Sequence, residues 1–133
     1  MYVKLIADGM PVERNHIYVV PPNCELTLCD NAFHLGTISK PLGWPRVITV
    51  FLKSAAETWT GKPVAVILSG VDSDGADALR NIKEAGGITF VQKRDTAQHP
   101  DMPQSAIDTG FVDFELSPEE IAHELVRIGS EKP

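Results

Sequence analysis

The chain has 133 residues, and its 12 Lys and Arg against 18 Asp and Glu give it a net charge of −6. This length fits one domain, since domains commonly have about 100–200 residues. The acidic charge argues against binding to nucleic acid or to an anionic membrane surface, because both need a basic face. The longest apolar run, Val64–Leu68, is far shorter than the ~20 residues that cross a membrane, so we expect no membrane insertion.

The N-terminus and the cysteines indicate a compartment. No basic segment followed by an apolar core comes after Met1, so the sequence has no secretory signal pattern. Cys24 and Cys29 are too few for a disulfide framework and fit a reducing cytosol, so we expect a cytoplasmic protein. Cys24, Cys29 and His34 are separated by five residues each, which makes a zinc site an alternative. However, Cys24 and Cys29 would face opposite sides of one strand, and we expect no metal and no cofactor.

The first third of the chain is predicted to consist of strands. Aromatic and β-branched residues predict strands at 3–6 and 16–20. Apolar and polar residues alternate at 26–28 and 33–35, on either side of Asp30-Asn31. This pattern predicts an antiparallel hairpin, because Asp and Asn tolerate positive φ in tight turns.

Helices and strands alternate in the rest of the chain. Apolar residues at helical spacing predict a helix over 46–59, after a loop at 37–45. Val64–Leu68 has no polar alternation, which predicts a strand buried on both faces, as in parallel sheets. The further predicted elements are a helix over 76–85, a strand over 88–91, a helix over 102–109 begun by proline, and a strand over 111–114.

The last helix has a clear start. Ser117 and Glu120 have the spacing of a capping box, and the helix is expected to bury Ile121, Leu125 and Ile128. The order of elements predicts an α/β fold with a mostly parallel, doubly wound sheet between helices, a three-layer arrangement with an antiparallel hairpin near the N-terminus. We expect residues 1–133 to form a single domain.

The most informative segment is the loop between the predicted strand at 64–68 and the helix that follows it. In open α/β sheets, ligands and catalytic groups collect at the carboxyl ends of the strands. Gly70 and Gly75 permit tight turns and close backbone approach. The loop carries three aspartates: Asp72, Asp74 and Asp77. Asp77 is expected to favour the positive end of the helix dipole, whereas Asp74 is a candidate functional residue.

Other chemistry is less well supported by the sequence. Asp72-x-Asp74 is similar to the Asp-x-Asp signature of magnesium-dependent phosphatases of the haloacid-dehalogenase type, and we keep that class as an alternative. No Gly-x-Ser-x-Gly turn, which exposes a serine nucleophile, occurs in the chain. Any of the four histidines could in principle act as a base, but none lies in a pattern that requires it. They are His16, His34, His99 and His123.

Five ordered stretches together resemble the catalytic domain of the bacterial chemotaxis protein-glutamate methylesterases of the CheB type. They are residues 8–23, 50–57, 66–76, 82–89, and 102–107 with 110–113. The third is similar to the family's Leu-(Ser/Thr)-Gly-Met-Gly-x-Asp-Gly-Ala segment. The resemblance covers nearly the whole chain and implies a doubly wound parallel sheet.

The resemblance also implies an activity and the residues that carry it. Members of the family hydrolyse glutamate methyl esters on chemoreceptors, and some deamidate glutamines there, with a Ser, a His and an Asp. The family's Asp falls on Asp74, which would orient the histidine and stabilise its positive charge. The backbone at Val71, in place of the family's Met, would contribute to the oxyanion pocket, with Gly70 and Gly75 supporting the loop.

The chain also departs from the family pattern. The family's Gly-x-Ser-x-Gly-Gly turn and its His precede the segment at 8–23, so we expect an N-terminally truncated domain that lacks strand–helix units. Such a chain alone is expected to be inactive, which leaves its status as an enzyme open. Asp72 replaces a family glycine, and the segment 40–45 lacks the usual substrate-side pattern. The alternative is a non-enzymatic binding or regulatory module derived from the same domain.

Partners follow from the resemblance and from the missing units. The resemblance implies the methylated cytoplasmic region of a chemoreceptor as the substrate. Missing strand–helix units would leave a parallel strand unpaired and apolar surface uncovered. We therefore expect a homodimer formed through the exposed sheet edge.

Overall fold

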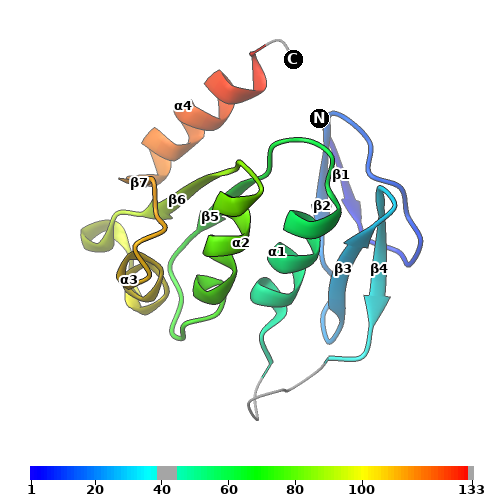
Figure 1. Cartoon of the computed structure of the whole chain (residues 1–133), viewed down its shortest axis with the longest axis horizontal. Helices are drawn as coiled ribbons and strands as arrows, with labels where there is room; N and C mark the ends of the chain where they lie inside the picture. The colour runs from blue at the N-terminus through cyan, green and yellow to red at the C-terminus, as the bar shows by residue number, and fades with distance from the viewer. Residues whose placement is uncertain (39–44, 132–133) are drawn as a thin grey trace.

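The computed structural model describes residues 1–38 and 45–131, so most of the predicted loop at 37–45 lies outside the described residues. Figure 1 shows the arrangement of the elements. The strands are β1 (Tyr2–Leu5), β2 (His16–Val19), β3 (Glu25–Cys29), β4 (Ala32–Gly36), β5 (Val64–Ile67), β6 (Ile88–Gln92) and β7 (Phe114–Leu116). The helices are α1 (Val47–Thr58), α2 (Leu79–Glu84), α3 (Asp101–Asp108) and α4 (Pro118–Gly129), with short 3₁₀ turns η1 (Ala76–Ala78) and η2 (Arg94–Thr96).

The strands form three small sheets. β5, β6 and β7 make a parallel sheet in that order, β1 and β2 make a parallel pair, and β3 and β4 form an antiparallel hairpin. Asp30 and Asn31 turn the hairpin with φ of 53° and 59°, as their tolerance of positive φ predicts. The predicted α/β class, with helices around a parallel sheet and a hairpin near the N-terminus, is confirmed.

Helix α1 lies between two hydrophobic cores. One side of it, with Phe51 and Ala55, packs on a cluster built around the hairpin and Ile6. Leu52 and Ala56 pack instead against the core under the parallel sheet. That second core contains Ala65, Ile67, Leu79, Ile82, Val91, Met102 and Ala106. The two apolar sides of α1 therefore place this helix between the hairpin and the parallel sheet (Figure 1).

The last strand begins later than the sequence predicts. Residues 111–113 are not a strand, because Thr89 of β6 holds them in other contacts. Its Oγ1 donates to Phe111 O at 2.6 Å and accepts from Asp113 N at 2.9 Å. Regular pairing starts only at Phe114, which lies opposite Phe90.

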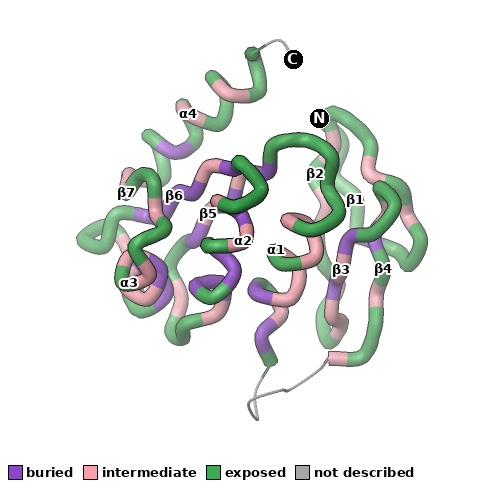
Figure 2. Tube along the Cα trace, viewed as in Figure 1, coloured by how far each residue is buried: buried purple, intermediate pink, exposed green. Residues whose placement is uncertain are grey.

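The predicted buried face of α4 is also partly wrong. Ile121 is 4% exposed and packs inward, but Leu125 is 40% exposed. Helix α4 packs against β6 and β7, and its second half extends beyond the sheet, where Figure 2 shows exposed and half-buried residues. The capping box that begins the helix is present as predicted.

No helix in the described ranges is long and apolar enough to cross a membrane.

Candidate functional site

The loop after β5 places Asp74 against the start of α1. Its Oδ2 accepts from Ile48 N and its Oδ1 from Thr49 N, both at 2.9 Å. These are N–H groups of the first turn, which a side chain of the N-cap residue normally satisfies. The N-cap residue Arg46 makes no such bond, so Asp74 caps the helix in its place. Its negative charge also lies at the positive end of the helix dipole.

Gly75 continues the same contact. Its N–H donates to Thr49 Oγ1 at 2.8 Å, which fixes the buried Thr49 side chain beneath the loop. Its φ is +94°, and an added Cβ would lie 2.7 Å from Ile67 Cδ1 and 3.1 Å from the Ile48 side chain. The position therefore requires glycine for both its backbone angle and the space around it.

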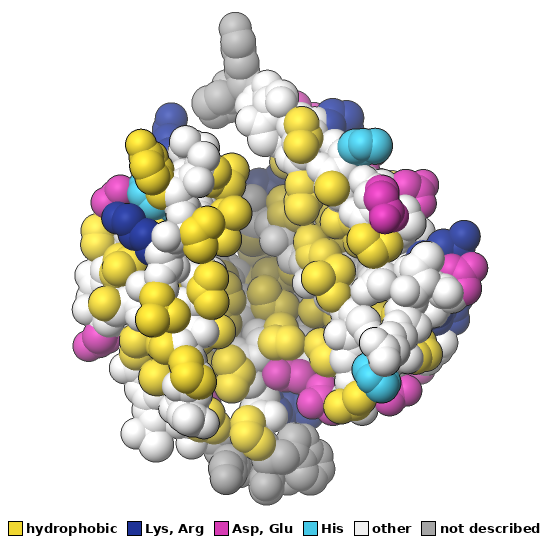
Figure 3. Space-filling model, turned by 180° about the vertical axis from the view of Figure 1, so that it is seen from behind, with side chains coloured by type: hydrophobic (Ala, Val, Ile, Leu, Met, Phe, Trp, Pro, Cys, Tyr) yellow, Lys and Arg dark blue, Asp and Glu magenta, His cyan; other side chains and the backbone are white. Residues whose placement is uncertain are grey.

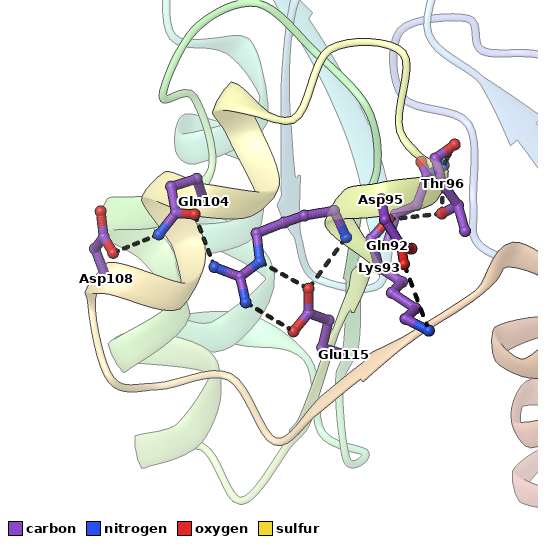
Figure 4. A network of polar contacts seen from close by, with 8 residues as sticks. Gln92, Lys93, Asp95, Thr96, Gln104, Asp108 and Glu115 are labelled. Atoms are coloured by element: carbon purple, nitrogen blue, oxygen red, sulfur yellow. Dashed lines mark hydrogen bonds and ion pairs between the residues drawn. The ribbon is translucent and has the colours of Figure 1, made fainter.

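The beginning of the loop is fastened to the chain segment that follows β6. Ser69 N donates to Gln92 Oε1 at 2.9 Å, and the Gln92 amide in turn donates to Thr96 O at 3.1 Å, the contact drawn in Figure 4. Ser69 Oγ and Gly70 N also bond the backbone of His99. A Cβ on Gly70 would collide with the Met102 side chain, so the loop lies tightly on the start of α3.

The other loop residues differ in their contacts. Val71 is 67% exposed. Asp72 Oδ1 accepts from Asp74 N at 2.8 Å, which stabilises the turn. Asp77 pairs with the buried Arg46 side chain at 3.0 Å and lies in the first turn of η1, so its position agrees with the predicted structural role.

No histidine or serine side chain among residues 1–38 and 45–131 bonds the Asp74 carboxylate. His99 lies in the loop before α3, and His16 bonds the Arg14 backbone at the start of β2. His34 and His123 lie on β4 and α4, respectively. The alternative of a zinc site at Cys24, Cys29 and His34 finds no support, because the described residues contain no group of three or more side chains that could hold a metal ion. Each Asp74 oxygen keeps acceptor capacity beyond its one N–H bond, so it can still receive an imidazole N–H.

Sequence reasoning missed three residues of this site: Arg46, Thr49 and Gln92. Gln92 could have been noticed as a polar residue closing the apolar run of β6, at the carboxyl end of a buried strand. Arg46 and Thr49 gave no such signal, because their contact partners, Asp77 and Gly75, lie 31 and 26 residues later in the chain, respectively.

Two carboxylates near the sheet have lowered pKa values. Two hydrogen bonds from Arg94 hold the pKa of Glu115 below its ordinary value: the bond from the side chain has the larger effect, and the bond from the backbone N–H the smaller one. Arg94 also donates to Gln104 Oε1 of α3 at 2.8 Å, and Figure 4 labels Glu115 and Gln104 in this network. Partial burial alone would raise the pKa of Asp113, but hydrogen bonds from Lys83 and Thr89 outweigh it and lower that pKa. Both pairs fasten β7 and the segment before it to the sheet.

Comparison with known proteins identifies the family. Residues 1–125 match the family described as CheB methylesterase. A Leptospira interrogans protein, provisionally named a protein-glutamate methylesterase/protein-glutamine glutaminase, is 37% identical over 127 residues. A protein-glutamate methylesterase/protein-glutamine glutaminase of Pyrococcus abyssi is 33% identical over 129 residues. The chain belongs to the CheB methylesterase family.

A solved structure supports the same assignment. The crystal structure of the Thermotoga maritima CheB methylesterase catalytic domain superposes with a TM-score of 0.81 at 28% identity, over 94% of this chain and 68% of that one. The chain likewise spans 66% of the Leptospira relative and 35% of the Pyrococcus one. About a third of the solved domain therefore has no counterpart in this chain.

Proposed function

We propose that this chain is the Asp-bearing part of a cytoplasmic protein-glutamate methylesterase, which hydrolyses glutamate methyl esters, and in some relatives deamidates glutamines, on chemoreceptors. The observation that carries the proposal is the fixed position of Asp74 at the carboxyl end of β5, where two backbone N–H groups of α1 hold its carboxylate. Family membership supplies the substrate class.

The geometry suits an orienting carboxylate. In a Ser-His-Asp arrangement the aspartate holds the histidine in one tautomer and stabilises the imidazolium formed during acyl transfer. The two hydrogen bonds from the α1 backbone restrict rotation of the Asp74 carboxylate. Its oxygens keep acceptor capacity for an imidazole N–H. The Gly70 N–H donates to His99 O, which supports the loop, and the backbone at Val71 is the part that we assign to an oxyanion pocket.

The contacts favour this class over a magnesium-dependent phosphatase. Asp72 and Asp74 would have to turn their oxygens toward a shared cation. Instead, both Asp74 oxygens bond the α1 backbone, and Asp72 bonds the Asp74 N–H. These bonds orient the two carboxylates toward protein donors.

The test joins this chain to the part of the Leptospira relative that lies outside the matched region. Methanol release from a methylated chemoreceptor fragment is measured for the chimaera, for this chain alone and for the complete relative. We expect release from the chimaera and the relative, and none from this chain alone. D74N in the chimaera should lower the rate about 10⁴-fold, as for the aspartate of a serine-protease triad, whereas D77N should not. A folded chimaera that releases no methanol, or one indifferent to D74N, would refute the proposal.

A further inference from the structure

A small apolar pocket opens between the hairpin and the start of α1. Its volume is about 140 Å³. The described residues that line it are all apolar: Val20, Leu26, Val47, Ile48 and Phe51. Leu26 and Phe51 belong to the hairpin core, so the pocket is a place where that core reaches the surface. Val20 and Ile48 are 39% and 36% exposed, so they border the opening.

The alternation of side chains along β2 explains why Val20 turns toward this pocket. The Tyr18 ring lies against Phe33 with 4.8 Å between ring centroids, and Phe33 lies against Phe51 of α1 with 6.4 Å between them. Val20 comes two residues after Tyr18 and therefore continues the same side of the strand. The hairpin core thus extends from β2 to α1 and ends at the pocket.

The pocket adjoins the candidate catalytic carboxylate through Ile48. The Ile48 N–H donates to Asp74 Oδ2 at 2.9 Å, while the side chain of the same residue lines the pocket. A Cβ on Gly75 would lie 3.1 Å from Ile48 Cγ2, so this side chain also lies beside the loop after β5. A single residue therefore connects Asp74 to the apolar pocket.

The pocket and Asp74 lie at the same end of the molecule. The end of β2, the start of α1 and the loop after β5 are all at the lower end of Figure 1. Figure 3 shows this end from behind, where acidic side chains are bordered by hydrophobic ones. Ligands of open α/β sheets bind at the carboxyl ends of the strands. A substrate that reaches Asp74 from this end therefore also meets apolar surface.

The size and the lining of the pocket indicate what it accepts. A closed apolar cavity of about 150 Å³ stays dry and binds benzene, because it offers water no hydrogen bonds. A pocket of about 140 Å³ therefore suits one aliphatic or aromatic side chain. The proposed substrate is a polypeptide, and it brings neighbouring side chains to the site together with its ester.

We propose that this pocket is a specificity subsite that takes one apolar side chain of the chemoreceptor substrate, close to the glutamate methyl ester that is hydrolysed. The inference rests on the proposed function and adds a recognition element to it. Val20 is the specificity-determining residue, since it is exposed at the opening. Burial of a leucine side chain there favours such a substrate at least about tenfold over one with serine at the same place.

The first test uses this chain alone. N-acetyl-leucinamide is titrated into the isotope-labelled full chain, and N-acetyl-serinamide is the matched probe. The leucine probe should shift the amide resonances of the five lining residues, and the serine probe should not. V20D should weaken binding of the leucine probe at least about tenfold. V126D, which changes an exposed valine of α4, should leave it within about twofold.

The second test measures methanol release by the chimaera from short peptides with one glutamate methyl ester. A leucine or a serine is placed at each position within one helical turn of the ester, one position at a time. At one of these positions leucine should raise kcat/KM at least about tenfold over serine. V20D should reduce this ratio to within about twofold, whereas V126D should leave it unchanged. V20T keeps the shape of valine and should reduce the ratio at least about threefold, and it replaces V20D if circular dichroism shows that V20D is unfolded.

Three results would overturn the inference: equal shifts from both probes, no preference for leucine at any peptide position, and equal effects of the Val20 and Val126 variants on that preference. Failure of the proposed function looks different. A folded chimaera that releases no methanol from any peptide removes the esterase proposal and the substrate assignment of the pocket together. An active chimaera without a leucine preference removes only the subsite.

Discussion

The Asp74 carboxylate accepts a hydrogen bond from the backbone N–H of Thr49 in the first turn of α1, and the Thr49 hydroxyl returns a contact to the residue after Asp74. Thr49 N donates to Asp74 Oδ1 at 2.9 Å, and the Thr49 hydroxyl accepts from the N–H of Gly75, the next residue, at 2.8 Å. Two chain segments 25 residues apart are thereby joined by a short, nearly reciprocal pair of bonds. The candidate catalytic carboxylate is thus also part of the framework of the fold.

Removal of the Asp74 side chain should destabilise the protein. D74A leaves two N–H groups of α1 without their acceptor, and loss of a helix cap costs about 1–2 kcal/mol in the free energy of unfolding. D74N retains one carbonyl oxygen and should cost less than about 1 kcal/mol. Urea unfolding followed by circular dichroism measures both. Equal stability of D74A and the parent protein would show that the cap contributes nothing.

Alanine should destabilise the protein more at position 75 than at position 86, where the glycine has a similar φ. G75A and G86A both place a Cβ at positive φ, +94° and +81°, which costs about 1–2 kcal/mol. Only at Gly75 does that Cβ also crowd Ile67 and Ile48, whereas nothing lies within 4 Å of it at Gly86. We expect G75A to be less stable than G86A by at least about 1 kcal/mol. Thermal and urea unfolding of the two variants side by side would reveal the difference, and its absence would contradict the crowding.

Gln92 should control the order of the loop that follows β5. Q92L removes the acceptor of Ser69 N and the donor to Thr96 O, so the Ser69 and Gly70 amides should exchange faster with solvent. The stability loss should be about 1 kcal/mol. Q104L is the control, because Gln104 belongs to the surface network of Figure 4 and its loss should stay within about 0.5 kcal/mol. Unchanged exchange at Ser69 in Q92L would show that the backbone bonds of His99 suffice.

Asp113 should contribute to stability at neutral pH and lose that contribution in acid. Its pKa in the folded protein is below the ordinary value, so the folded state favours the ionised form. The stabilisation is therefore complete above about pH 4, the ordinary aspartate value, and decreases as the pH falls through the lower folded value.

The D113N variant isolates this effect. It should be less stable than the parent at pH 7, and the gap should narrow below about pH 4. Urea unfolding from pH 7 to pH 2.5 gives both curves. D108N, which changes an exposed aspartate of α3 that bonds Gln104, serves as the control. Parallel curves for D113N and the parent would contradict the linkage.

Much of the fold could be predicted because its signals are local. The turn at Asp30-Asn31, the unbroken apolar run of β5 and the capping box of α4 depend on a few neighbouring residues. The start of β7 could not be predicted, because the hydroxyl of Thr89, more than twenty residues earlier, hydrogen-bonds the backbone of residues 111 and 113. Leu125 has helical spacing with Ile121, yet it extends past the sheet that would cover it.

The site could be predicted only in part, for the same reason. The glycines and Asp74 mark a loop at a strand end, which is a local pattern. The residues that shape this loop, Thr49 and Gln92, come from other elements, and only the folded chain brings them to it. The catalytic role of Asp74 stays a prediction that the chimaera tests.

The capping contacts of Asp74 affect how relatives of this protein are recognised. A descendant that lost its catalytic partners would no longer need an orienting carboxylate, but it would still need an acceptor for the first turn of α1. Selection for folding alone would then preserve the aspartate together with Gly75. An intact Ser-Gly-x-x-x-Asp-Gly signature in a newly sequenced genome therefore identifies the architecture of the domain, while activity has to be assigned from the serine and histidine.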